Sequence, residues 1–291
     1  MNNGRLRVRL RSRVRGRWLG LALVFFAPAM LQAQATMGAT ADVRVTIDNT
    51  SGSITVTAWD RNEVSVLGSR SVLRDLEIDA TPQSVQLKMQ AGHYLEVKVP
   101  RGAQLRAKSV SGFVRVEGVE GSVDIESASG TLQVTGTPRS IHARGFSGGV
   151  SIFGGGTEVT RAESISGSVI ITRANGIVEA RSASGGVNVK GSVKDAQLFS
   201  VSGTVSFDGS VERSGKLTAE SSSGAVELIV PRNMPADYEL STITADIDNE
   251  FGPPATKARG AAGVAVKFST GNGGARIKGA SVSGSIRLSD R

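Results

Sequence analysis

Residues 180–189 read Ala-Arg-Ser-Ala-Ser-Gly-Gly-Val-Asn-Val, and this phrase returns along the chain with a glycine at its centre. The regular copies are centred on Gly112, Gly130, Gly148, Gly167, Gly185 and Gly203, and looser copies on Gly224 and Gly284. The regular copies recur at nearly constant intervals of about 18 residues, and a fixed period of this kind indicates a repeat architecture.

Apolar residues alternate with other residues on both sides of each glycine. Around Gly203 they are Ala196 and Leu198 before the glycine, and Val205 and Phe207 after it. Alternation at a spacing of two predicts a half-buried strand, so each repeat should contain two short strands. A helix cannot connect them, because half a repeat is about nine residues and a helical crossover needs at least about 10 to 12. We therefore predict an all-β fold, a parallel β-solenoid with coils of about 18 residues and irregular β caps at both ends.

Charged residues recur at two outward positions of the first strand. Four positions before the glycine, the copies carry in order Lys108, Glu126, Arg144, Glu163 and Arg181. Six positions before it they carry Arg106, Asp124, His142, Arg161 and Glu179, which alternate less regularly. In-register stacking would bring neighbouring members to about 4.8 Å from one another, where opposite charges attract. We interpret these positions as an exposed structural ladder rather than a binding stripe.

Serines occupy the positions three and one before most of the glycines, as Ser200 and Ser202 do before Gly203. Small hydroxyl side chains bond backbone groups in tight turns, so we expect a structural role at one corner of the coil. The alternative is a row of hydroxyls that binds or accepts glycans.

The first 35 of the 291 residues have the pattern of a secretory signal peptide. Seven arginines precede an apolar run from Trp18 to Leu31, and Ala33-Gln34-Ala35 follows. We expect cleavage after Ala35, or after Ala33 as second choice; an uncleaved anchor is the alternative. Without this segment the 34 Lys+Arg fall to 27 against 26 Asp+Glu, a net charge of +1. Nucleic acid is therefore not an expected partner, and no stable membrane insertion is expected after cleavage.

The remaining chain divides into three parts that we expect to form one continuous domain. Residues 36–100 contain strands without the strict period and read as an N-terminal β cap, which a solenoid needs to cover its open edge. Residues 101–230 form the regular solenoid, and residues 231–291 contain irregular coils and a C-terminal cap. The distance in sequence from Gly224 to Gly284 predicts three successive coils of about 20 residues, with a loop at Gly252–Gly263. We expect specific function where the period fails, at Ala41–Pro100 or Pro231–Gly279.

The chain resembles the exported bacterial family labelled putative adhesins, a β-solenoid domain of unknown function. The resemblance rests on residues 99–102 (Val-Pro-Arg-Gly) leading into residues 110–118, on the serial Ser-Gly-x-apolar-x-apolar copies, and on residues 269–274 (Ser-Thr-Gly-Asn-Gly-Gly). It covers about residues 41–288. The family has no catalytic signature to transfer, and its name implies surface binding.

Motifs that would carry chemistry all have simpler explanations. Residues 145–149 match G-x-S-x-G, but Ser147 occupies the position before a repeat glycine. His93 and His142 lie far apart in the sequence, and neither has partners at metal-ligand spacing. Residues 246–252 resemble the start of a calcium loop, yet Phe251 stands where glycine is needed.

Glycine clusters and carboxylates do not suggest a site either. The runs at residues 154–156 and 271–274 are not followed by a helical pattern, so they read as turns rather than phosphate loops. Enzymes that cleave polysaccharides use paired carboxylates, whereas the outward carboxylates here are single and opposed by bases. The sequence has no cysteine, so there are no disulfides. We predict no catalytic residue, no cofactor or cofactor-binding residue, and no metal ligand.

The sequence thus predicts a non-catalytic β-solenoid protein exported to the periplasm or to the cell surface. We expect it to act as an adhesin-like binding or scaffold module in the cell envelope, with an unidentified envelope protein or glycan as partner. Two alternatives remain. One is a carbohydrate-active enzyme on a β-helix, and the other is a periplasmic sensor or assembly partner.

Overall fold

The computed structural model describes residues 32–90, 92–257 and 263–291. They form two compact units, one ending at Pro138 and the other beginning at Arg139. The predicted signal peptide lies outside the described residues up to residue 31. Its predicted cleavage point after Ala35 falls inside the first strand, β1 (Gln32–Gly38). The segment boundaries at residues 100 and 230 stay predictions.

Strands make up almost all of the regular structure in the first unit. They are β1 (Gln32–Gly38), β2 (Arg44–Ser51), β3 (Ile54–Trp59), β4 (Glu63–Ser69), β5 (Leu76–Thr81), β6 (Ser84–Met89), β7 (Leu95–Pro100), β8 (Gln104–Ser111), β9 (Val114–Glu117), β10 (Ser122–Ser127) and β11 (Leu132–Gly136). Buried and less buried residues alternate along them, as in β10, where Val123 and Ile125 are in the core. The all-β prediction is confirmed.

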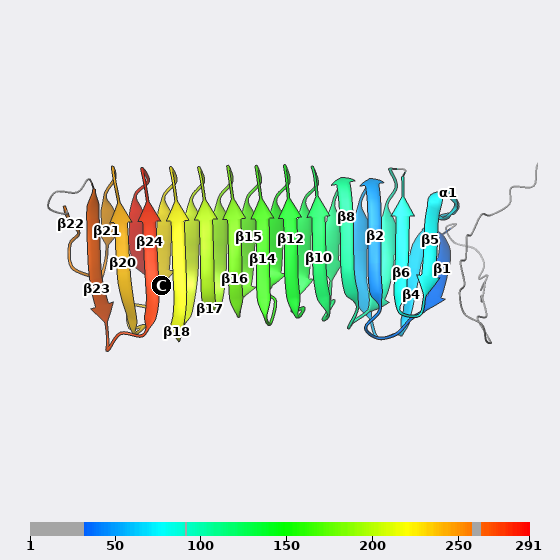
Figure 1. Cartoon of the computed structure of the whole chain (residues 1–291), viewed down its shortest axis with the longest axis horizontal. Helices are drawn as coiled ribbons and strands as arrows, with labels where there is room; N and C mark the ends of the chain where they lie inside the picture. The colour runs from blue at the N-terminus through cyan, green and yellow to red at the C-terminus, as the bar shows by residue number, and fades with distance from the viewer. Residues whose placement is uncertain (1–31, 91, 258–262) are drawn as a thin grey trace, which may run out of the picture. The chain divides into compact units, whose positions relative to one another are not determined.

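The first repeat-like segment stacks inside the N-terminal end rather than at its edge. Strand β2 pairs in parallel with both β6 and β8, so it lies between them (Figure 1). Strand β3 lies likewise between β7 and β9. Beyond these parallel strands, β5 pairs antiparallel with β6, and β4 pairs antiparallel with both β7 and β1. Antiparallel strands therefore cover the outer side of residues 84–100.

A short helix, α1 (Arg70–Asp75), connects β4 to β5 and was not predicted from the sequence. The Ser69 hydroxyl accepts a hydrogen bond from the backbone N–H of Val72, which is an N-cap arrangement. Val72 is the buried residue of this helix. The helix is too short for a helical period to be visible in the sequence.

The second unit is also built of strands. They are β12 (Ser140–Gly145), β13 (Val150–Gly154), β14 (Val159–Ser164), β15 (Val169–Ala174), β16 (Ile177–Ser182), β17 (Val187–Ser200), β18 (Val205–Ser221), β19 (Val226–Val230), β20 (Ala236–Thr242), β21 (Ile247–Asn249), β22 (Thr256–Lys257), β23 (Val264–Thr270), β24 (Ala275–Ser281) and β25 (Ile286–Asp290). Parallel pairing dominates in both units.

Parallel strands of the repeat pair in register. Leu105 lies opposite Val123 in the first unit, and Val178 lies opposite both Thr160 and Ala196 in the second. In each pair the partners are one period apart in the sequence, as in-register stacking predicts. In β17 and β18, however, the two short strands between successive turns are continuous. The reason is that the connection at Gly191–Val193 pairs residue by residue with Gly209–Val211 and so stays in the ladder.

At the C-terminal end, the prediction of three successive coils is wrong. Residues 224–284 do not form three successive coils, because β24 pairs in parallel with both β18 and β20 and therefore lies between them (Figure 1). Strand β25 likewise pairs with β19 and with β21. The last copy of the repeat thus stacks directly on the regular repeats, since it retains the matching glycine and serine. The less regular β20 lies outside it and is covered by the antiparallel β23.

Aromatic side chains fill this C-terminal end. The rings of Tyr238 and Phe268 stack with centroids 4.8 Å apart, and Phe251 meets Tyr238 edge to face at 5.8 Å. Burial raises the pKa of Tyr238 to about 12. The end of the stack is therefore closed by packing as well as by backbone pairing.

Candidate functional site

The glycine–serine turns show what the repeated phrase does. The Ser200 side chain is fully buried, and its hydroxyl accepts a hydrogen bond of 2.9 Å from the N–H of Gly203. The same hydroxyl donates at 2.9 Å to the carbonyl of Gly185, one repeat earlier. Ser164, Ser182, Ser221 and Ser281 make the same two bonds in their own repeats. The serines three before the glycine are thus structural, as predicted.

Turn glycines are required because successive turns approach closely. A Cβ on Gly203 would lie 2.2 Å from the carbonyl oxygen of Gly185, and one on Gly185 would lie 2.3 Å from that of Gly167. No side chain fits at such distances. The turn leaves the residue two before each glycine pointing outward, as the exposure of Ile165 and Val201 shows.

The remaining sequence motifs have structural partners. His93 lies 3.8 Å from Asp75, and the partly buried His142 has its Nε2 3.4 Å from Arg144 Nη2. Ser147 of the G-x-S-x-G match is exposed at a turn. His93 lies in the first unit, whereas His142 and Ser147 lie in the second. Among the described residues, no group of three or more His, Cys, Asp or Glu could hold a metal ion.

The segment that resembles a calcium loop is also occupied by protein contacts. Asp248 lies 3.2 Å from Arg287, and Glu250 accepts a hydrogen bond from the backbone N–H of Asp290. Asn249 accepts a hydrogen bond from the N–H of Gly252 and so holds the turn. These side chains fasten the chain around β21 and β25.

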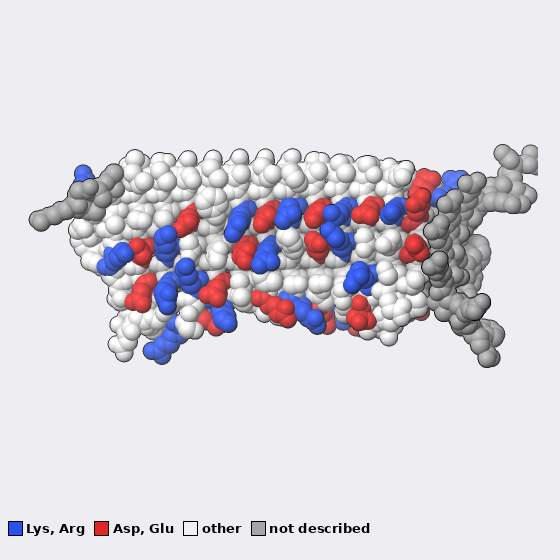
Figure 2. Space-filling model, in the orientation of Figure 1, with Lys and Arg blue, Asp and Glu red and all other residues white. Residues whose placement is uncertain are grey.

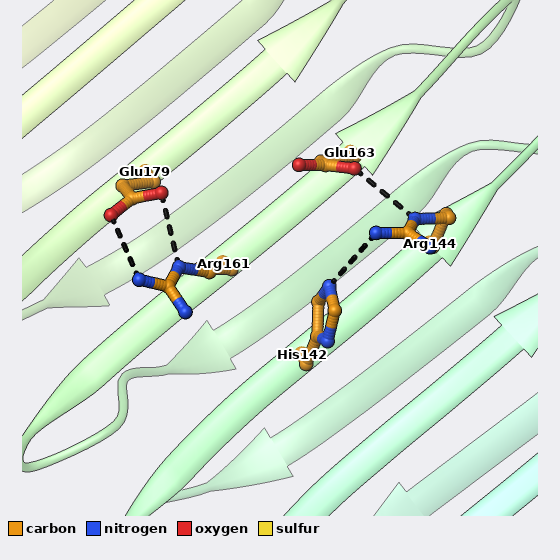
Figure 3. A network of polar contacts seen from close by, with 5 residues as sticks. All are labelled: His142, Arg144, Arg161, Glu163 and Glu179. Carbon is orange, nitrogen blue, oxygen red and sulfur yellow. Dashed lines mark hydrogen bonds and ion pairs between the residues drawn. The ribbon is translucent and has the colours of Figure 1, made fainter.

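The charge ladder is present on the outward side of the first strands. In the first unit Lys108 lies 2.9 Å from Glu126, and in the second Arg144 lies 3.2 Å from Glu163. Arg161 and Glu179 form a two-point contact at 3.0 and 3.3 Å (Figure 3). The hydrogen bond to Glu179 raises the pKa of Arg161. The predicted in-register ladder is confirmed for these pairs.

The ladder is interrupted at the C-terminal half of β17 and resumes with Glu220, which lies opposite Phe199 in β18. The positions four and six before Gly203 should carry the next charges, but they are occupied by Phe199, opposite Arg181, and by Gln197, opposite Glu179. Thr218 lies beside Gln197 in the following strand. Figure 2 shows rows of basic and acidic side chains on this face, interrupted by an uncharged stretch. Phe199 is 38 % exposed within it.

An apolar ridge borders this uncharged stretch. We use the term for the residues two before the glycines of four consecutive turns, namely Phe146, Ile165, Ala183 and Val201. Backbone hydrogen bonds from Ser166, Ser184 and Ser202 to the ridge residue of the preceding repeat stack these turns on one another. Phe146, Ile165 and Val201 are 54 %, 49 % and 42 % exposed. This position was not predicted from the sequence to have a function, although it is apolar in most copies.

A groove of about 840 Å³ lies along the ridge and the uncharged stretch. Strands β12, β14, β16, β17, β18 and β24 contribute its lining. The ridge forms one wall, and Gln197, Phe199 and Thr218 lie in the interruption of the ladder. Every strand named here belongs to the second unit, so the groove is a feature of residues 139–291.

Charges around the groove are not balanced. Its described lining contains four cations, Arg144, Arg181, Lys216 and Lys278, and two carboxylates, Glu163 and Glu220. Both carboxylates are in ion pairs, with Arg144 at 3.2 Å and Lys278 at 2.7 Å. The hydrogen bond with Glu220 raises the pKa of Lys278. Arg181 and Lys216 form no ion pair within the part of the chain that the structure describes. The groove can therefore bind apolar groups and anions.

A second groove, of about 610 Å³, lies on the first unit. Polar and charged residues, including Arg44, Asp48 and Arg106, dominate its lining. Arg106 is engaged with Asp124 at 3.5 Å. No exposed large apolar side chain lines this groove among the described residues, which makes the groove of the second unit the better candidate for a binding site.

None of the helices in the described part of the chain is long and apolar enough to cross a membrane.

Residues 39–289 match the family model described as Toastrack DUF4097, and the chain therefore belongs to this family. A search among curated proteins gave no match. Among solved structures, a putative adhesin from Bacteroides fragilis is similar with 10 % identity over 90 % of this chain and 98 % of that chain, at a TM-score of 0.44. A putative cell adhesion protein from Clostridium sporogenes has 5 % identity over 89 % of this chain and 99 % of that chain, at a TM-score of 0.24. A putative lipid binding protein from Parabacteroides distasonis has 11 % identity over 88 % of this chain and 96 % of that chain, at a TM-score of 0.38.

Proposed function

We propose that this member of the Toastrack DUF4097 family is an exported, non-catalytic binding module of the bacterial cell envelope, and that it binds through the groove of residues 139–291. The observation that carries the proposal is the interruption of the charge ladder. There an exposed apolar ridge, an exposed Phe199 and two cations without ion pairs among the described residues lie around one groove. Exposed apolar surface rimmed by polar residues is typical of interaction sites.

The scaffold of this module is a parallel β-solenoid with coils of about 18 residues. Parallel partners that are one period apart in the sequence, such as Val178 and Ala196, support this description. The serine bridge from Ser200 to Gly185 and Gly203 supports it too, because it joins one turn to the next. Such a scaffold holds the ridge residues in a row at a constant spacing.

The absence of catalysis is supported by the use that the chain makes of its polar groups. Glu163 and Glu220, the carboxylates of the groove, are both held in ion pairs. General acid–base catalysis needs a group whose pKa lies near the working pH and that can reach a substrate. Carboxylates that neutralise adjacent bases are poor candidates for that role.

Export is supported by the arginine-rich, apolar and small-residue order of residues 1–35. The destination in this proposal is the periplasm or the cell surface, with an envelope component as partner. Cleavage after Ala35 would leave Thr36–Gly38 of β1 in the mature protein.

Fractionated envelopes provide the test. The mature protein, beginning at Thr36, is mixed with membranes, with cell-wall sacculi and with outer-surface polysaccharide, and the bound fraction is measured by sedimentation. We expect one component to retain the wild-type protein and to lose most of the double variant Phe199→Ser, Arg181→Gln. The matched control is Phe153→Ser, since Phe153 is 45 % exposed but does not line the groove.

Retention of the groove variant at the wild-type level would contradict the proposal, and so would loss of binding in the control. A mature protein that none of the three components retains would contradict it as well. Circular dichroism of each variant verifies that the fold is unchanged.

A further inference from the structure

We infer that the groove binds a single anionic amphiphile, a molecule with an aliphatic chain and a carboxylate or phosphate head. This inference rests on the proposed function and names the ligand class of the same groove. The chain would lie along Phe199 and the apolar ridge, and the head would be attracted by the positive charges of Arg181 and Lys216, which stand on β16 and β18 and are offset by four residues along the strand direction.

The anionic head follows from the balance of charge. The two carboxylates of the lining are already paired with Arg144 and Lys278 at 3.2 and 2.7 Å. Arg181 should find its next partner at the position of Phe199, where the ladder has no acid. Lys216 lies opposite Asp195 in the pairing of β18 with β17. Asp195 accepts a hydrogen bond from the backbone N–H of Lys216, but within the described chain it forms no ion pair with the Lys216 side chain. The groove therefore has two positive charges to be neutralised by a ligand.

The aliphatic chain follows from the ridge. Phe146, Ile165, Ala183 and Val201 stand in four consecutive repeats, so the ridge is roughly 14 Å long at about 4.8 Å per step. Phe199, two residues before Val201, widens the apolar surface beside the head position. A linear chain can lie along this row and remove several exposed apolar side chains from water, which favours binding.

Other occupants match the groove less well. An added peptide strand needs unpaired backbone, but each of β14, β16 and the C-terminal half of β17 is already paired on both sides. A glycan needs many hydrogen-bonding groups and flat aromatic platforms. The groove has aromatic rings in Phe146 and Phe199, but its uncharged stretch offers few hydrogen-bonding groups, the side chains of Gln197 and Thr218, and aliphatic Ile165 and Val201 continue the ridge.

Calorimetric titration of the full mature protein tests the inference. The probes are decyl phosphate and decanoate, both below their critical micelle concentrations. Decanol and inorganic phosphate are titrated as well, because they carry the chain and the head of decyl phosphate separately. We expect both amphiphiles to bind at one site. Decanol and phosphate should bind at least about tenfold more weakly, because each lacks one of the two contacts.

Variants assign the two contacts. The double variant Arg181→Gln, Lys216→Gln should bind decyl phosphate about tenfold or more weakly than the wild type does, and its affinity for decanol should be unchanged. The double variant Val201→Ser, Phe199→Ser should bind both decyl phosphate and decanol more weakly. The matched controls are Lys190→Gln, a lysine engaged with Asp208 at 3.3 Å, and Phe153→Ser. Both controls should bind as the wild type does.

Several outcomes would overturn the inference: equal binding of decanol and decyl phosphate, loss of binding in the controls, or retention in the charge variant. Binding to phosphatidylglycerol vesicles without binding of the monomeric amphiphiles would indicate a membrane surface instead and overturn it. Binding of polygalacturonate without binding of the amphiphiles would also overturn the inference and would indicate a glycan as the ligand. If an envelope component still requires the groove while the amphiphiles do not bind, the inference fails and the proposed function stands.

Discussion

The turns and the charged positions of the same strands form two periodic regions of this protein with opposite physical character. At the turns, Ser200 is fully buried and joins two glycines of neighbouring repeats. At the charged position, one residue before the serine position, Arg144 and Glu163 form an ion pair on the surface, with side chains 44 % and 35 % exposed. Buried hydrogen bonds are costly to break, whereas exposed ion pairs contribute little. Regular spacing in a sequence therefore does not by itself reveal how much a position stabilises the fold.

The sharpest way to break this comparison is to add a methyl group at a turn. Gly203→Ala would place a Cβ 2.2 Å from the carbonyl oxygen of Gly185. The two turns must separate, and we expect a loss of about 3 kcal/mol in the free energy of unfolding, measured by chemical denaturation. Gly149→Ala is the control, since its Cβ would lie 3.4 Å from the nearest atom, the oxygen of Ser168. Equal losses in both variants would show that close approach is not the reason for the turn glycine.

A smaller effect is expected from the serine bridge. Ser200→Ala leaves the N–H of Gly203 and the carbonyl of Gly185 without this partner, which should cost about 2 kcal/mol. The control is Ser202→Ala, whose side chain is exposed at the same turn. Thermal unfolding of the two variants measures the difference. Identical melting temperatures would mean that the buried bridge does not stabilise the turn.

The smallest effect concerns the ladder. Glu163→Lys would place three cations side by side, because Glu163 lies between Arg144 and Arg181. It should destabilise more than Glu163→Gln, by roughly 0.2 to 1 kcal/mol. The difference should shrink at high salt. Equal melting temperatures of the two variants at low salt would argue against an energetic role for the ladder.

Local chemistry made much of the fold predictable. Alternating apolar residues identified the strands, the period identified the parallel register, and the serine before each glycine identified the corner. The register fixes which residues are neighbours, so the sequence alone predicts the pairs of Lys108 with Glu126 and of Arg144 with Glu163. The short helix at Arg70–Asp75 could not be predicted, because its cap and its one buried valine resemble an ordinary turn.

The candidate groove was harder to predict than the fold. We expected function outside the regular repeat, but the groove lies mostly on it. A sequence signal existed, namely the replacement of a charge by Phe199 and the apolar residues two before the glycines. What the sequence could not reveal is that Arg181 and Lys216 lack ion-pair partners among the described residues, because that depends on side-chain positions in strands β16, β17 and β18.

The sequence by itself determined the repeat, its parallel register and the role of its corner, because each of these depends on residues one period apart. Only the tertiary structure decided the order of stacking at the ends. There β2 and β24, both near the ends of the chain in sequence, lie inside the stack, and the less regular β6 and β20 lie outside them. The physical reason is that a strand stacks on the neighbour whose glycine, serine and apolar positions match its own, and chain order does not constrain that choice when the connecting segments are long enough to return.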